Sequence, residues 1–254
     1  MGDEIFFLRF APELKARGAE ITYLADPKIG SIVARLPFID RVVREAEESE
    51  EVDFTLSVGD LPFILGMKSA ADIPPPYPLP VQPERAARME ARLKRLGPPP
   101  HVGLTWRAGT PNKPGAVFKV APLDEIAKAL CPAKATFLAL QRKPEAGEID
   151  RLSGGLGRPV HDFTAANEDL EEMLALLSLM DEYVTVSNTN VHLRAGTGRT
   201  SRVLVPNPPE YRWMAEGEES PWFPGCKLYR QKVDGAWEEA LAALARDHKE
   251  AFRD

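Results

Sequence analysis

Small polar residues follow a predicted strand at residues 183–186 and lead into a helical pattern that contains His192. They are Ser187, Asn188, Thr189 and Asn190. The first amides of a helix have no partner within the helix, so a loop of this kind can bind an anion such as a phosphate. A second interpretation needs no ligand, because Ser187 or Asn188 can simply cap the helix. His192 then either faces a ligand or packs inside the protein.

Two more polar loops follow predicted strands at residues 102–106 and 136–140. The candidate binding residues at the first are Trp106, Arg107 and Thr110. Its small, hydroxyl and cationic residues suit a phosphate or a sugar, and Gln141 opens the second loop. Taken alone, the first loop is slightly more typical of an ordinary Gly/Pro surface turn, and polar loops such as the second are common in α/β proteins. The carboxyl ends of parallel strands meet at one edge of a sheet, however, so we expect the three loops to lie together where such sheets bind ligands.

Two charged residues near the start of predicted helices complete the candidates. Lys119 precedes a helix predicted at 123–130, where it either reaches a diphosphate as a point charge or lies in solvent. Asp3 opens the first helical pattern, and the positive end of the helix dipole alone explains an acid there. At the edge of a cleft, the same carboxylate can act as a general base. A functional role for Lys119 or Asp3 requires that the helices and strands bring distant parts of the chain together.

Short apolar runs alternate with helical patterns, which predicts parallel sheets covered by helices on both faces. The first half is predicted to contain helices at residues 4–17 and 28–36 and strands at 20–25, 41–44 and 53–58. The second half is predicted to contain strands at 102–106, 136–140, 183–187 and 202–206 and helices at 123–130, 170–180 and 236–252. We therefore expect an α/β fold.

Proline divides the chain. Nine of its 24 prolines lie between Pro74 and Pro100, on either side of a helix predicted at 83–96. We expect an N-terminal domain over 1–82, a linker helix and proline junction over 83–100, and a C-terminal domain over 101–254, because strands and helices alternate on both sides. The other interpretation is a long surface excursion within one domain.

Composition excludes several classes of protein. The 254 residues include 32 Lys and Arg against 38 Asp and Glu, a net charge of −6 that argues against a nucleic-acid partner but permits a small anionic ligand. Hydrophobic residues make up 44%, enough for a sizeable core. Two cysteines supply neither a disulfide framework nor an all-protein zinc site, and we expect no metal and no cofactor. No apolar run approaches the ~18 residues of a transmembrane segment, so we expect a cytoplasmic protein.

A series of short motifs runs through nearly the whole chain. They lie at residues 2–10, 15–18, 36–37, 40–43, 73–78, 102–106, 119–123, 140–141, 186–193, 209–213, 220–224 and 228–231. The most specific are Pro209-Glu-Tyr-Arg-Trp213 and Ser220-Pro-Trp-Phe-Pro224. Together they resemble the glycosyltransferase module at the C-terminal end of bacterial tetratricopeptide-repeat proteins, which is itself similar to the lipopolysaccharide heptosyltransferases. We expect Trp213 and Trp222 to pin their loop to the domain rather than to stack on a ligand.

The resemblance implies a GT-B-like architecture, in which two Rossmann-like domains with parallel sheets face a cleft. The family has a β-strand and a glycine-rich turn before its Gly-Asp pair, which corresponds here to Gly2 and Asp3. We therefore expect an N-terminal domain that lacks its first strand. The tetratricopeptide repeats of the family do not occur in this sequence.

The resemblance also assigns roles to particular residues. Asp3 matches the catalytic base, and Lys119 matches the lysine that reaches the phosphates of the sugar donor. The segment from Ser187 to His192 matches the loop that holds the nucleotide sugar. Ser187 and Asn188 stand where the family has Asp-Thr, whereas His192 is retained.

The activity implied is that of a glycosyltransferase of hexosyl or heptosyl type. It would move a sugar from a nucleotide-diphosphate sugar to an acceptor hydroxyl with inversion, the acceptor being a glycan, a lipid-linked sugar or a protein. The alternative is a catalytically inactive GT-B-like module that binds a nucleotide or a protein partner. The absent strand and the replaced loop acid favour that alternative.

Overall fold

Six parallel strands form a sheet in the second half of the chain. The computed structural model describes residues 1–45, 52–109, 119–132 and 134–252. The strands are β3 (His101–Thr105), β6 (Thr136–Ala139), β7 (Val160–Asp162), β8 (Glu182–Val186), β9 (Arg202–Val205) and β10 (Lys227–Arg230). They lie in the order β10-β9-β8-β3-β6-β7, each parallel to its neighbours. β3, β6 and β8 are buried throughout, as their continuous apolar runs predict.

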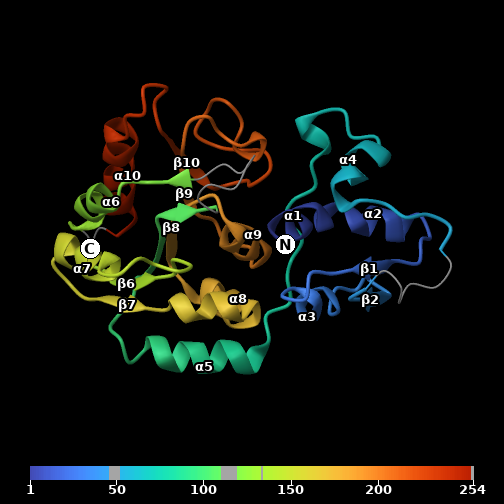
Figure 1. Ribbon diagram of the computed structural model, residues 1–254, viewed down its shortest axis with the longest axis horizontal. Coiled ribbons are helices and arrows are strands. Elements are labelled where there is room, and N and C mark those ends of the chain that lie inside the picture. Colours follow the sequence, from blue (N-terminus) through green and yellow to red (C-terminus); the bar gives the residue numbers. More distant parts are fainter. Residues whose placement is uncertain (46–51, 110–118, 133, 253–254) are drawn as a thin grey trace.

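Helices cover both faces of this sheet (Figure 1). One face packs against α5 (Pro83–Leu93), α8 (Leu170–Leu179) and α9 (Thr189–Gly196). The other packs against α6 (Leu123–Leu130), α7 (Glu148–Leu156) and α10 (Glu238–Ala251). Successive side chains of a strand point to opposite faces, so Tyr183 belongs to the first apolar layer and Val184 to the second.

The N-terminal part is built from shorter elements. They are α1 (Gly2–Phe7), η1 (Leu8–Phe10), α2 (Ala11–Ala16), β1 (Thr22–Leu24), α3 (Gly30–Val33), β2 (Arg41–Val43), η3 (Val58–Asp60), α4 (Leu61–Ile64) and η4 (Ala70–Asp72). β1 and β2 pair in parallel, and they are the two strands of the N-terminal sheet within the described residues. The helix predicted at 4–17 is divided, because Pro12 at the start of α2 has no amide hydrogen to donate to the preceding turn. The strand predicted at 53–58 does not form, and Phe54 there is 83% exposed.

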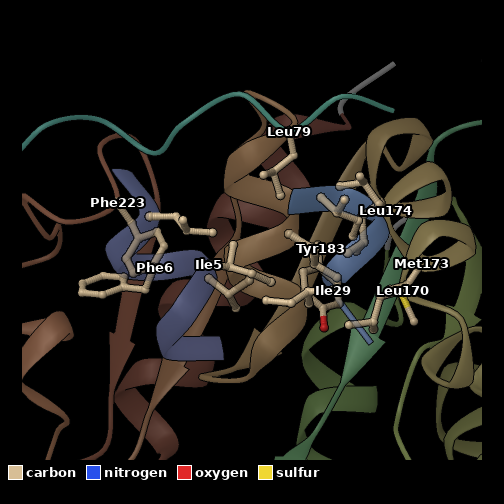
Figure 2. Close-up of a cluster of buried hydrophobic side chains, with 14 of the residues drawn as sticks. Ile5, Phe6, Ile29, Leu79, Leu170, Met173, Leu174, Tyr183 and Phe223 are labelled. Carbon is tan, nitrogen blue, oxygen red and sulfur yellow. The ribbon is translucent and has the colours of Figure 1, made fainter. Parts of the chain in front are cut away.

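The two parts of the chain share one apolar cluster (Figure 2). Ile5 and Phe6 of α1, together with Ile29, pack in the same cluster as Leu174 of α8 and Tyr183 of β8. Ion pairs reinforce the contact, since Arg35 lies 2.6 Å from the Glu171 carboxylate and Lys28 lies 3.1 Å from that of Glu168. The N-terminal ends of helices α1 and α9 contact each other, and the candidate site lies at this contact.

The segment between the two parts is tied to α9. The amide of Leu79 donates a hydrogen bond of 2.7 Å to the carbonyl of Gly196. A Cβ atom at Gly196 would lie 2.5 Å from Cγ of Leu79, so this close crossing requires a glycine. α5 follows and packs on α8, where Arg85 lies 2.6 Å from the Asp169 carboxylate. Across the described ranges, no helix combines the length and apolar character that crossing a bilayer requires.

Candidate functional site

The polar loop after β8 builds the N-terminus of α9. The Asn188 Oδ1 atom accepts hydrogen bonds from the amides of Asn190 (2.8 Å) and Val191 (3.3 Å), so Asn188 is the N-cap. Its Nδ2 group donates to Thr185 Oγ1 at 2.7 Å. Ser187 is buried, and the buried Asn190 donates to Asn167. These side chains set the direction in which α9 leaves the sheet.

His192 lies one turn into α9 and is buried. Its Nε2 atom lies 3.1 Å from Nη1 of Arg212. Arginine has no acceptor atom, so Nε2 accepts this hydrogen bond and the ring proton lies on Nδ1, which has no partner. Burial, followed by the positive charges of Arg212, Arg9 and Lys119, lowers the pKa of His192 well below its usual value. His192 is therefore a neutral hydrogen-bond acceptor at neutral pH.

Arg212 connects His192 to Asp3. Its Nη2 atom donates to Oδ1 of Asp3 at 2.7 Å, while the guanidinium also lies 5.0 Å from the ring centroid of Phe6. The Asp3 side chain is 67% exposed, and its Oδ2 atom has no hydrogen-bond partner among the described residues. Figure 1 shows the first residues of the chain beside α9, which is how an acid at position 3 reaches an arginine at position 212. The structure thus brings Asp3 and His192 to the two terminal nitrogens of one guanidinium.

Lys119 lies on β5 (Lys119–Val120), which pairs with β4 (Arg107–Ala108) in an antiparallel ladder. Its Nζ atom lies 3.1 Å from Oε1 of Glu210, and the two side chains are 13% and 20% exposed. The other carboxylate oxygen of Glu210 is buried without a partner. Lys119 therefore already faces a carboxylate, and Glu210 and Arg212 bring their opposite charges into the site from one segment.

The candidate residues in the loops after β3 and β6 make contacts within the protein that hold these two loops in place. Gln141 accepts hydrogen bonds from the amides of Trp106 (3.1 Å) and Arg107 (3.0 Å) and donates one to the carbonyl of Arg107 (3.1 Å). Arg107 forms an ion pair with Glu148 of α7, and Trp106 is buried. Thr110 lies outside the described residues.

A third cation, the buried Arg9, lies near Arg212. Arg9 donates from Nε to the carbonyl of Phe6 (2.8 Å) and from Nη1 to that of Trp222 (2.7 Å). Burial lowers the pKa of Arg9 to about 10, so it still carries its charge at neutral pH. The three cations Arg9, Arg212 and Lys119 outnumber the two carboxylates of Asp3 and Glu210, and this excess of positive charge favours an anionic ligand.

Sequence reasoning missed Glu210, Arg212 and Arg9 as members of this site. A signal was available, because Glu210 and Arg212 lie in the most specific motif, Pro209-Glu-Tyr-Arg-Trp213. Trp213 and Trp222 from the two motifs are buried, and Trp213 stacks on Phe223 with centroids 4.7 Å apart. Both tryptophans thus pin the loop, as predicted. No group of three His, Cys, Asp or Glu side chains in the described part of the chain is arranged to hold a metal ion.

Comparisons of the whole chain agree with this architecture. The protein superimposes on a glycosyl transferase family 9 protein from Veillonella parvula with a TM-score of 0.64 and 11% sequence identity. The superposition covers 99% of this chain and 93% of that one. ADP-heptose LPS heptosyltransferase II from Escherichia coli gives a TM-score of 0.62 with 14% identity, covering 98% and 96%. The fold is GT-B-like. At these identities, the likeness concerns the fold.

Sequence comparison identifies one longer relative. The protein FlbA of Caulobacter vibrioides is 25% identical over 268 residues, which cover 96% of this chain and 44% of FlbA. The chain therefore spans less than half of the curated relative that it matches. No family model matches the sequence.

Proposed function

We propose that this protein is an inverting glycosyltransferase that uses a nucleotide-diphosphate sugar. The observation that carries the proposal is the Asp3–Arg212–His192 connection, in which one guanidinium contacts an exposed carboxylate and a buried neutral imidazole. An exposed carboxylate next to an excess of positive charge is the arrangement that transfer from a diphosphate donor needs. The GT-B-like fold supports the same conclusion.

The reaction assigns one task to each charged group. The acceptor oxygen attacks the anomeric carbon of the donor from the face opposite the diphosphate, and Asp3 Oδ2 takes the hydroxyl proton. The bond between the anomeric carbon and the diphosphate oxygen breaks, and the diphosphate leaves with the electron pair. Lys119 and Arg212 stabilise the negative charge that develops on it. His192 stays neutral and accepts from Arg212, which fixes the direction of the guanidinium.

A donor diphosphate would compete with Glu210 for the Lys119 ammonium group. The ion pair of Lys119 and Glu210 is 3.1 Å long, and the second Glu210 oxygen is buried without a hydrogen-bond partner. An unpaired buried acceptor costs about 1–3 kcal/mol, so release of Glu210 toward solvent offsets part of the cost of breaking the pair. Donor binding is therefore expected to move Glu210.

Calorimetric titration with UDP-, ADP-, GDP- and CDP-sugars tests the proposal, followed by assays of sugar transfer with the donor that binds. We expect Asp3→Asn to keep donor affinity and to lower turnover at least ~100-fold, because a general base contributes about that much. Asp124→Asn is the matched control, since Asp124 also lies in the first turn of a helix and pairs with an arginine at 2.7 Å. Failure of every donor to bind, or full turnover by Asp3→Asn, refutes the proposal.

A second candidate is a non-catalytic module that binds a nucleotide or a protein partner. The observation that favours it is that the charged groups assigned to the reaction already have protein partners, Lys119 with Glu210 and Asp3 with Arg212. It predicts nucleotide binding without turnover in the wild-type protein. The same titration and assay therefore separate the two candidates.

We further propose a division into an N-terminal unit (1–82), a junction (83–100) and a nucleotide-sugar-binding unit (101–254). The distinct sheets of the two parts support it. We also propose a cytoplasmic location, supported by the two cysteines, Cys131 and Cys226, which are both free thiols. The match to under half of FlbA is consistent with a module that occurs within longer chains.

A further inference from the structure

Tyr211 is an exposed tyrosine whose ring contacts the arginine that holds the Asp3 carboxylate. It is 53% exposed, whereas the next two residues, Arg212 and Trp213, are buried. Of the five tyrosines in the chain, it is the exposed one. Its ring centroid lies 5.1 Å from the Arg212 guanidinium that holds Asp3. The ring and the carboxylate therefore flank the same guanidinium.

The ring of Tyr211 is braced from below. It makes edge-to-face contacts with Phe6 and Trp222, with centroids 6.1 Å and 6.2 Å apart. Both of these residues are buried, so the exposed ring rests on the core rather than at the end of a mobile side chain. A ring held in this way is ready to receive a flat apolar surface without losing much conformational freedom.

Two hydrogen-bonding groups lie beside this ring. The Tyr211 hydroxyl and the Asp3 Oδ2 atom have no protein partner among the described residues. Burial raises the pKa of the Tyr211 phenol, so at neutral pH the hydroxyl is protonated and can both donate and accept. An aromatic face with a hydroxyl and a carboxylate at its side matches a pyranose ring, which has an apolar C–H face and polar hydroxyls around its edge.

We propose that the acceptor is a saccharide whose ring lies on Tyr211 and presents one hydroxyl to Asp3. The inference rests on the proposed function and names its acceptor class. A serine or threonine of a protein acceptor would use the carboxylate equally well, but it has no ring to cover the aromatic face. The observations therefore favour a sugar acceptor over a peptide.

Binding measurements without a sugar donor test the acceptor site separately from the reaction. The probes are methyl glycosides of common hexoses and of a heptose, with serine- and threonine-containing peptides, and the readout is saturation transfer from protein to ligand by NMR. We expect at least one glycoside to bind through its ring protons. Loss of the aromatic contact in Tyr211→Ala should weaken it about tenfold.

Further variants distinguish the ring from its hydroxyl and from its bulk. Tyr211→Phe keeps the ring, and we expect binding within about threefold of wild type. Tyr211→Leu keeps apolar bulk without a π face and should bind as weakly as Tyr211→Ala. Phe63→Ala is the matched control, because Phe63 is an 87% exposed aromatic on α4, and it should bind like wild type.

Each outcome bears on one proposal. Failure of every glycoside to bind, or equal binding by wild type and Tyr211→Ala, overturns the saccharide acceptor. Peptide binding without glycoside binding overturns it in favour of a protein acceptor. If glycosides bind through Tyr211 but no nucleotide sugar binds, the acceptor site stands as a saccharide site and the proposed glycosyl transfer fails.

Discussion

Glu210→Gln removes one negative charge beside Lys119 while it keeps the shape of the side chain, and we expect it to tighten nucleotide-sugar binding. In the structure, Glu210 pairs with the ammonium group that the proposed function assigns to the donor diphosphate. The glutamine amide oxygen can still accept a hydrogen bond from Lys119, but a neutral acceptor holds it more weakly than a carboxylate does. The donor therefore meets a weaker competitor.

The size of the effect follows from the geometry of the pair. A hydrogen bond to a charged group contributes about 1.5–3 kcal/mol net. The 3.1 Å separation is slightly long and the two side chains are 13% and 20% exposed, which places this pair near the lower limit. A gain of about 1.4 kcal/mol corresponds to about tenfold tighter donor binding.

The same change should destabilise the protein without ligand. Lys119 loses its carboxylate partner, and a loss of about 1 kcal/mol lowers the Tm by roughly 2–4 °C for a chain of this size. We therefore expect a lower Tm without donor and a larger rise in Tm when a saturating donor is added. Calorimetry gives the donor Kd, and thermal unfolding with and without donor gives the two Tm values.

An order of donor affinities opposite to the expected one refutes the reasoning. If Glu210→Gln binds the donor more weakly than wild type, Glu210 contacts the donor rather than competing with it. Unchanged affinity would show that the donor does not use Lys119. The control is Glu239→Gln, which alters an exposed Lys–Glu pair of 2.6 Å with Lys232, and neither quantity should change.

Two further predictions concern stability. His192 has a lowered pKa in the folded state. As the pH falls below about 6.5, the unfolded chain therefore binds a proton at this residue that the folded protein does not. The free energy of unfolding should fall in that range by up to about 1.4 kcal/mol per pH unit. Urea denaturation at pH 7, 6 and 5 should give a smaller pH dependence for His192→Gln, and an equal dependence would contradict a neutral buried imidazole. Gly196→Ala should cost about 1–3 kcal/mol because its Cβ would meet Leu79 at 2.5 Å. In the same denaturation assay, the double variant Gly196→Ala/Leu79→Ala should lose less stability than the sum of the losses in the two single variants. Strictly additive losses would show that the contact between residues 196 and 79 is not the cause.

The strands that line the site followed from the sequence. Those predicted at 102–106, 136–140, 183–187 and 202–206 correspond to β3, β6, β8 and β9, because each is an apolar run long enough to be buried on both faces. β7 and β10 were missed. β7 has three residues and ends in His161 and Asp162, and β10 has only two apolar residues between Lys227 and Arg230, so neither is a long apolar run. These edge strands are specified by their neighbours in the sheet.

The helix between β6 and β7 was also missed. α7 contains Gly154 and Gly155, which disfavour a helix in an isolated peptide. A Cβ at Gly155 would lie 2.6 Å from Cβ of Ala127, so the glycine permits α6 and α7 to approach each other closely. Packing in the folded protein therefore overrides the local propensity.

The sequence alone determined the alternation of strands and helices, the polar loop at the start of α9 and the identity of Asp3, Lys119 and His192 as chemical candidates. These features depend on residue type and on spacing within about ten neighbours, where periodicity and capping act. Only the tertiary structure decided which charges meet. Asp3 and Arg212 are 209 positions apart, and Lys119 and Glu210 are 91 apart, yet each pair is in contact. The physical reason is that α1 and the segment after β9 are both anchored by buried aromatic side chains, and that packing sets where their charged residues point.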